Sequence, residues 1–302
     1  MALPEQDAAT VADYPEVEDN SNEKKRQLKN KIFKGIFFGA VLFSLLMLLI
    51  LLVRIFTQGI GFLNWEFMTS FASRNADEAG IQAAIVGTFW MMVVTAPVAF
   101  VLGVGTAVYL EEYAPTNKFT ALIQMNISNL AGVPSIVFGL LGLTIFVREL
   151  SMGRSVLAGG LTMALLILPI IVVASQEAIR SVPSEMREAS FGMGATKWQT
   201  MFRIIFPAAL PGILTGNILA LSRAIGETAP LIMIGALTYI AFLPDNVFSQ
   251  FTVMPIQIFN WTSRPQEEFH FIAAAGIIVL LAMLLLMNSI AVWIRNKFQQ
   301  RF

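Results

Sequence analysis

The sequence predicts an all-α membrane protein with six transmembrane helices, and three observations support this fold class. First, 56% of the 302 residues are hydrophobic and only 13% are charged, about half the charged fraction of a soluble domain. Second, long uncharged stretches alternate with short charged segments, and roughly 20 apolar residues suffice to cross the hydrocarbon core. Third, the basic residues are unevenly distributed among the charged segments. Together these observations indicate a multi-pass membrane protein.

The membrane domain is expected to cover residues 32–302. Residues 1–31 form a tail that is acidic up to Glu23 and basic from Lys24 onward, and this composition predicts disorder. The apolar run that follows is longer than the core of a signal peptide, and no small-residue cleavage site follows it. We therefore expect it to be a retained anchor. Transmembrane helices are expected at about residues 32–56, 81–109, 119–147, 155–175, 208–239 and 272–294.

The helix at 81–109 contains Pro97, Gly103 and Gly105, which are candidate points of kinking or close packing. The helix at 119–147 is unusual because polar residues and Pro134 lie in its first half. Backbone groups freed near Pro134 need partners inside the protein or at a water-lined cavity. If Pro134 opens a half-helix, Ser135 and the neighbouring N–H groups would face the cavity as an anion site. The alternative is a simple proline kink in which Ser135 bonds to the preceding turn.

A charged segment at residues 180–207 follows the expected helix at 155–175. Ser181 before Pro183 predicts the start of a short helix that runs to about Phe191. Gly192 and Gly194 then provide positions where φ can be positive.

Thr196, followed three residues later by Gln199, predicts a capping box that opens a second short helix. The result is a helix-turn-helix projection that carries Arg187, Glu188 and Lys197 outward. Its small side chains at Ala189, Ser190 and Ala195 would let the projection enter a groove on another protein. The alternative is an ordinary amphipathic loop on the membrane surface.

The stretch at 208–239 contains Gly212 and Gly216, a GxxxG pair that allows another helix to approach closely. As one helix of about 32 residues it would span about 48 Å, too long for a straight crossing. We therefore expect a break near Gly226 to Pro230. The last helix, at 272–294, follows a long outer loop.

Arg223 and Glu227 are the charged residues that fall in the interior of an expected span, away from its ends. A charge near the middle of the membrane costs about 2.5–3.5 kcal/mol on insertion scales, so its presence implies a use. Residues four apart share a helical face and can pair, and a guanidinium can bond two oxygens of an oxyanion. We expect Arg223 to offer charge to a passing anion while Glu227 positions it and prevents over-tight binding. The alternative is a purely structural pair.

Most Lys and Arg residues fall on one side of the expected helices, which predicts that this side and both termini are cytoplasmic. The segment at 180–207 lies on the same side. The basic residues expected on the outer side are Arg54, Arg74, Arg148, Arg154 and Arg264.

Composition also excludes several classes of function. A net charge of zero gives no electrostatic case for nucleic acid binding. His270 is the single histidine and cysteine is absent, so no metal site is expected. The chain lacks a GxxxxGK[ST] phosphate loop and is not expected to hydrolyse ATP itself. An intramembrane hydrolase is disfavoured because Ser135 has no histidine to activate it.

Three motifs resemble one family of transporters. Glu188-Ala189-Ser190, three residues, Gly194, nine residues, Ile204, one residue and Phe206-Pro207 resemble the cytoplasmic coupling loop of ABC importer permeases, with Ser190 and Phe206 replacing Ala and Leu. RAIGETAPL at 223–231 and AGVPSI at 131–136 resemble the A-type permease subunit of the bacterial phosphate-specific ABC importer. The resemblance covers about residues 33–301.

The resemblance implies a type I importer permease in the bacterial inner membrane that moves phosphate past Arg223, Glu227 and Ser135. It implies four kinds of partner: a C-type permease subunit, two ATP-binding subunits, an extracytoplasmic phosphate-binding protein and the lipid membrane. The ATPases would bind ATP and Mg²⁺, leaving this chain without a cofactor or catalytic residue. Coupling would fall to Arg187, Glu188, Ala189, Gly194 and Lys197. The alternatives are a permease for sulfate or molybdate, and a channel or receptor without energy coupling.

Overall fold

The computed structural model describes residues 20–298, and within this range it is helical apart from loops and one isolated bridge between Ser155 and Gln250. The chain divides into two units, Met1–Arg54 and Ile55–Phe302. Helix α1, Asn20–Gly59, makes up the described part of the first unit and extends into the second. The tail expected to be disordered lies outside the described residues up to residue 19.

Residues 20–31 were expected to belong to the disordered tail, but they are helical. This stretch is rich in Lys, Arg, Gln and Glu, which are good helix formers. Extending a helix that the apolar run has already nucleated fixes only one residue for each hydrogen bond gained. The helix therefore continues past the end of the apolar run.

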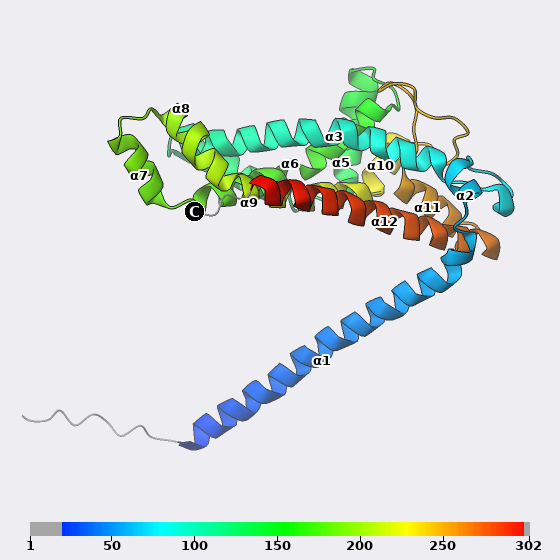
Figure 1. Ribbon diagram of the computed structural model, residues 1–302, viewed down its shortest axis with the longest axis horizontal. Helices are drawn as coiled ribbons and strands as arrows, with labels where there is room; N and C mark the ends of the chain where they lie inside the picture. Colours follow the sequence, from blue (N-terminus) through cyan, green and yellow to red (C-terminus); the bar gives the residue numbers. More distant parts are fainter. Residues whose placement is uncertain (1–19, 299–302) are drawn as a thin grey trace, which may run out of the picture. The chain divides into compact units, whose positions relative to one another are not determined.

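The second unit is a bundle of helices joined by loops and by short 3₁₀ and π-helical segments (Figure 1). Its α-helices are α2 (Trp65–Thr69), α3 (Gln82–Val108), α4 (Lys118–Leu130), α5 (Ser135–Gly142), α6 (Val156–Arg180), α7 (Ser184–Gly192), α8 (Lys197–Thr200), α9 (Phe206–Gly226), α10 (Ala229–Ile234), α11 (Met254–Thr262) and α12 (Glu267–Phe298). The 3₁₀ turns are η1 (Ile60–Phe62) and η2 (Ala76–Glu78), and the π turns are η3 (Tyr109–Tyr113), η4 (Leu143–Glu149) and η5 (Met201–Ile205).

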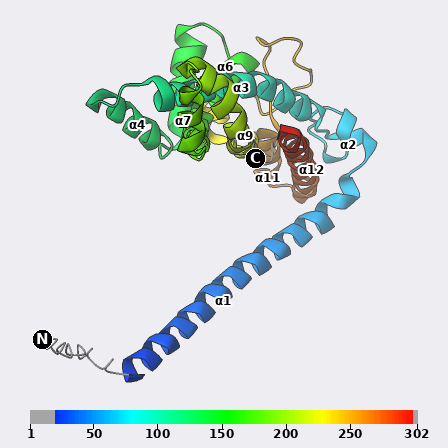
Figure 2. The same ribbon diagram turned by 60° about the vertical axis from the view of Figure 1, so that its left-hand side comes forward.

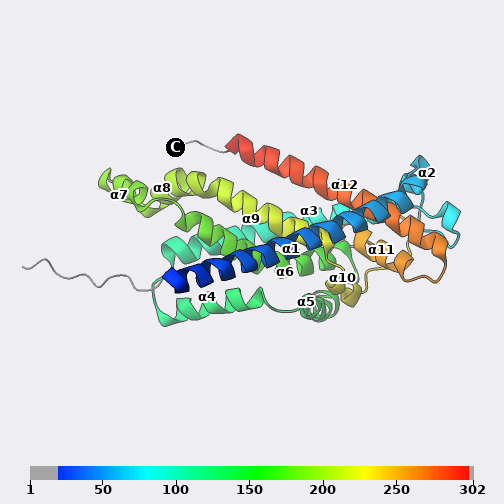
Figure 3. The same ribbon diagram turned by 90° about the horizontal axis from the view of Figure 1, so that it is seen from below.

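Within residues 20–298, five continuous helical stretches are long and apolar enough to cross a membrane: Lys25–Phe62, Gln82–Tyr113, Val156–Arg180, Lys197–Gly226 and Glu267–Lys297. The helices Lys118–Leu130 and Ser135–Glu149 are bent by 104° at the break between them, and together they make a sixth candidate span if the pair is counted as one broken span. In Figure 3, α4 is seen lengthwise and α5 nearly end-on. The predicted fold class is confirmed, but the third span is a bent pair where one helix was expected over 119–147.

The core of the second unit lies where α6 packs between α3 and α9. Met163, Ile167, Ile171 and Ile213 are completely buried there. A Cβ atom added at Gly216 would lie 2.4 Å from the Ala174 Cβ atom on α6.

At the neighbouring position, a Cβ atom added at Gly212 would lie 2.8 Å from the Ala178 Cβ atom. The predicted close approach of a helix to the GxxxG pair is thus confirmed, and α6 is the helix that approaches.

The stretch expected as a helix at 208–239 forms two helices. Helix α9 ends at Gly226 and α10 begins at Ala229, so the break falls within the predicted range. Helix α10 ends earlier than residue 239 because Gly235 adopts a left-handed conformation with φ 86°, a common helix terminator. Helices α5 and α10, which follow the two breaks, pack together at Gly139, where an added Cβ would lie 2.7 Å from the Pro230 Cα.

Candidate functional site

The expected charged pair forms at the end of the fifth span. Arg223 lies in the last turn of α9, and Glu227 directly follows that helix in an extended conformation. The Arg223 Nε atom lies 3.2 Å from the Glu227 Oε1 atom, and it donates a hydrogen bond there. The Arg223 side chain is 52% exposed, whereas that of Glu227 is 20% exposed. A permanently charged group therefore lies on an open face of a membrane-spanning helix.

The position of this pair follows from the local sequence. Pro230 cannot donate a backbone hydrogen bond, and in a continuous helix its ring would clash with the carbonyl of Gly226, four residues before it. The helix therefore stops at Gly226, and the Glu227 N–H bonds the Ala224 carbonyl at 3.3 Å. The guanidinium of Arg223 lies at the C-terminus of α9, where the helix dipole favours a cation.

A polar contact between α9 and α12 holds α9 in place beside Arg223. This contact was not identified from the sequence. The Ser222 hydroxyl lies 2.6 Å from the Asn288 Oδ1 atom on α12 and 2.7 Å from the Ile218 carbonyl. An amide inside an apolar helix is a signal that could have revealed this contact, because polar residues in transmembrane helices bond across to their neighbours. The contact restricts rotation of α9 and so helps to set the direction of the adjacent Arg223.

Ser135 is the first residue of α5 and is half-buried. The helix restarts after Pro134, as the anion-site interpretation requires. The simple-kink alternative is not observed, because the 104° bend separates two helices. In the described part of the chain, Ser135 makes no hydrogen bond to the preceding turn, to Arg223 or to Glu227. Ser135 therefore begins α5 and is not bonded to the Arg223–Glu227 pair.

The charged segment after α6 forms the helix-turn-helix projection that the sequence predicts. Figure 1 shows α7 lying beyond the ends of the long helices, on the side of the molecule that is turned forward in Figure 2, and α8 lies close to it. Thr196 and Gln199 form the predicted capping box, with N···O distances of 3.3 and 2.9 Å. Gly194 has φ 81°, which confirms the positive φ expected at this turn.

The first helix of the projection begins later than expected. The helix expected to end at residue 175 continues as α6 to Arg180, and the Ser181 hydroxyl bonds the Ala178 carbonyl at 2.8 Å. Ser181 therefore closes α6, and α7 begins at Ser184, immediately after Pro183.

Four of the five predicted coupling residues are exposed on the projection: Glu188, Ala189, Gly194 and Lys197. Arg187 departs from the expectation that it points outward. Its Nη2 atom lies 2.9 Å from the Glu112 Oε1 atom at the end of α3 and 3.2 Å from the Ile179 carbonyl.

Ser190 is also not available to enter a groove on another protein. It is buried, with its hydroxyl 2.8 Å from that of Thr200. The two short helices of the projection are thus bonded to each other on their inner side.

The acidic partners at the end of α3 were not identified from the sequence. Glu111 accepts hydrogen bonds from Gln176 at 2.7 Å and from two nitrogens of Arg180 at 2.7 and 2.9 Å. The neighbouring Glu112 faces Arg187. Two adjacent carboxylates directly after an apolar span are a signal that could have been used, since buried charges require partners.

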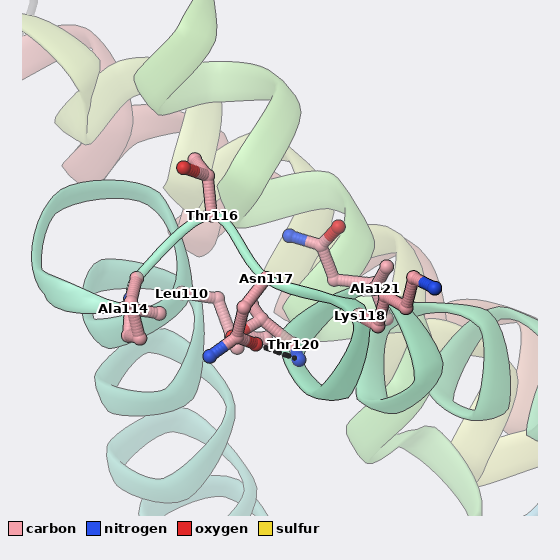
Figure 4. A pocket seen from close by; sticks show the side chains of 9 residues that line it. Leu110, Ala114, Thr116, Asn117, Lys118, Thr120 and Ala121 are labelled. Carbon is pink, nitrogen blue, oxygen red and sulfur yellow. Dashed lines mark hydrogen bonds between the residues drawn. The ribbon is translucent and has the colours of Figure 1, made fainter.

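A recess of about 540 Å³ lies beside these residues, where the η3 turn leads into α4 (Figure 4). Asn117 in its wall accepts a hydrogen bond from the Thr120 backbone N–H at 2.8 Å and caps α4. None of the predicted site residues lines the recess, so it is separate from the charged pair and from the exposed face of the projection.

Comparison with known proteins gives consistent matches over most of the chain. Residues 99–301 match the family described as binding-protein-dependent transport system inner membrane component. The chain is 32% identical over 290 residues to the probable ABC transporter permease protein YqgI of Bacillus subtilis (strain 168), covering 91% of this chain and 98% of that protein. It is 31% identical over 275 residues to the phosphate transport system permease protein PstA 1 of Mycobacterium tuberculosis (strain CDC 1551 / Oshkosh), covering 90% of each.

Solved structures show the same fold. A bacterial ABC transporter involved in the import of alginate superposes with a TM-score of 0.65 at 15% identity, covering 91% of this chain and all of the other. The inward-facing MetNI methionine ABC transporter superposes with a TM-score of 0.60 at 18% identity, covering 72% of this chain and 95% of that one.

Proposed function

The chain belongs to the binding-protein-dependent transport system inner membrane component family, and from this premise we propose that it is the membrane-spanning subunit of an importer that carries inorganic phosphate into the cytoplasm. Relatives that cover about nine tenths of the chain are named phosphate transport permeases. The observation that carries the proposal is the exposed Arg223 inside a membrane span.

The charge of Arg223 suits a passing oxyanion. A guanidinium is always protonated and presents parallel N–H donors that match two oxygens of a phosphate. Placing this charged group in contact with lipid would cost free energy. The exposed side of Arg223 therefore faces a pathway between subunits. Glu227 bonds the same guanidinium through Nε, and its carboxylate competes with the anion. This competition keeps binding weak enough for release.

Coupling is assigned to the exposed face of the α7–α8 projection. Glu188, Ala189, Gly194 and Lys197 face solvent there and form the contact surface for an ATP-binding subunit. The complete importer combines this chain with a C-type permease subunit, two ATP-binding subunits and an extracytoplasmic phosphate-binding protein. ATP and Mg²⁺ bind to the ATP-binding subunits. The projection and both termini face the cytoplasm, in agreement with the distribution of Lys and Arg.

The test is ATP-dependent uptake of labelled phosphate by the complete complex in proteoliposomes. Replacing Arg223 with Gln removes charge-assisted hydrogen bonds worth about 1.5–3 kcal/mol, which predicts about a 10- to 100-fold loss of uptake. The matched control Arg74→Gln removes an exposed arginine outside the spans and leaves uptake unchanged. Excess unlabelled phosphate competes, whereas excess sulfate or molybdate does not. Normal uptake by an assembled Arg223→Gln complex would refute the role of Arg223, and competition by sulfate would refute the choice of substrate.

A further inference from the structure

Two adjacent glutamates in the π-helical turn at the end of α3 each contact an arginine from a different part of the chain. Glu111 binds Arg180 at the end of α6, whereas Glu112 lies 2.9 Å from Arg187 in α7. The turn is closed by a hydrogen bond from the Ala114 N–H to the Tyr109 carbonyl. Such π-helical turns are rare and occur frequently at functional sites.

The Glu112–Arg187 pair is substantially buried. The side chains are 15% and 28% exposed, compared with 51% for Arg180 in the neighbouring pair. Among the described residues, the Arg187 Nε atom and the Glu112 Oε1 atom are buried without a hydrogen-bond partner, although Oε1 is close to Nη2. A buried pair that is incompletely bonded is a poor source of stability, because apolar residues of similar volume would often serve as well or better.

The position of the pair gives it a mechanical role. The inner side of α7 contacts the rest of the projection through the Ser190–Thr200 hydrogen bond, and Met186 packs on the core. Arg187 adds a direct link from α7 to the end of α3, and α3 packs along α6 in the core of the bundle. The same guanidinium bonds the Ile179 carbonyl in the last turn of α6, so one side chain joins three helices.

We propose that Glu112 is a positioning residue for the coupling projection: by holding Arg187, it ties α7 to the end of α3, so that a displacement of α7 by the ATP-binding subunit is passed directly to α3. This inference rests on the proposed function, because it assigns α7 to the contact with that subunit. A merely structural pair would affect how much complex assembles, whereas a positioning pair sets how much substrate moves for each ATP hydrolysed.

The main variant is the double substitution Glu112→Gln with Arg187→Gln. Removing one partner would leave a buried charge uncompensated, but removing both avoids that penalty. The matched control is Glu177→Gln, which removes an exposed carboxylate 3.4 Å from Arg180 and 67% exposed. Phosphate uptake and ATP hydrolysis are measured in the same proteoliposomes containing the complete complex. We expect hydrolysis within about twofold of the wild type and about a tenfold lower ratio of phosphate to ATP, with the control unchanged.

A conservative variant separates charge from shape. Glu112→Asp keeps the carboxylate but shortens the side chain by one methylene, so we expect it to retain much of the wild-type ratio. A wild-type ratio in the double variant would overturn the proposal, and so would an equal loss in the Glu177→Gln control.

A second measurement does not depend on the substrate. The chain contains no cysteine, so spin labels can be attached at Glu185→Cys on α7 and Val101→Cys on α3, both exposed positions. With the pair intact, the distance between the labels stays constant when the complex binds ATP. In the double variant, this distance changes on ATP binding and its distribution broadens. If the distance distribution in the double variant did not change on ATP binding, the proposal would be overturned. If the distances changed as expected but the complex took up no phosphate, only the proposed substrate would be overturned.

Discussion

The crossing of α6 and α9 predicts a sharp response to one added methyl group. In Gly216→Ala the new Cβ atom would lie 2.4 Å from the Ala174 Cβ atom, whereas two carbon atoms pack at about 3.5–4.0 Å. The helices must separate by about 1 Å or the side chains must shift. Overpacking of this kind typically costs about 1–3 kcal/mol. Since α9 carries Arg223, the same displacement is expected to lower phosphate uptake.

Alanine is also a better helix former than glycine by about 0.8–1.0 kcal/mol, and this gain must be separated from the packing loss. Gly105→Ala in α3 provides the matched control, because an added Cβ atom there meets no atom within 4 Å. The control is expected to be neutral or stabilising. The difference between the two variants therefore measures the packing loss at Gly216.

The measurement is the apparent melting temperature of the purified protein in detergent, compared at one heating rate because unfolding of membrane proteins is often irreversible. We expect Gly216→Ala to melt several degrees below Gly105→Ala. Adding Ala174→Gly removes the opposing methyl group and should restore most of the lost stability. The packing argument fails if Gly216→Ala melts at the temperature of Gly105→Ala, or if the added Ala174→Gly substitution restores nothing.

Two further predictions concern the charged pair and the projection. Glu227→Gln removes the carboxylate that competes for Arg223, so we expect the KM for phosphate and the maximal uptake rate both to fall; a raised KM would contradict the proposed competition. Ser190→Ala leaves the buried Thr200 hydroxyl without its 2.8 Å partner, a loss of about 1–3 kcal/mol. We therefore expect amide hydrogen exchange in the Ser190→Ala variant to be faster in α8 but not in α3. Unchanged exchange in α8 would show that the Ser190–Thr200 hydrogen bond does not stabilise the projection.

Features that depend on neighbouring residues in the chain could be predicted from the sequence. The capping box at Thr196, the positive φ at Gly194 and the break after Gly226 each require only local spacing. The close approach at Gly216 was also predictable, because two small residues four apart on a helix leave room for a partner helix. The sequence could not identify α6 as that helix, since many apolar helices would fit.

Where a feature depends on a distant partner, the sequence signals at most that a polar group needs a partner and does not identify it. Arg187 looks like a surface residue in its local sequence, and its inward direction depends on Glu112, which lies on a different helix. The contact between Ser222 and Asn288 likewise joins two helices far apart in the chain. The polar residues around Pro134 indicated freed backbone groups, but local pattern does not determine the angle at which α5 leaves α4.

The sharp bend between α4 and α5 affects the stability of a copy of the chain that is not assembled with other subunits. The ends of two helices leave carbonyl and N–H groups without intrahelical partners, and Ala131, Gly132 and Pro134 at the bend are exposed in the described chain. Hydrocarbon offers nothing to satisfy such groups. A solitary copy in the bilayer would therefore draw water or a protein neighbour to this spot. An unassembled copy should be prone to proteolysis at this point, and a protein neighbour packed on the bend would shield it.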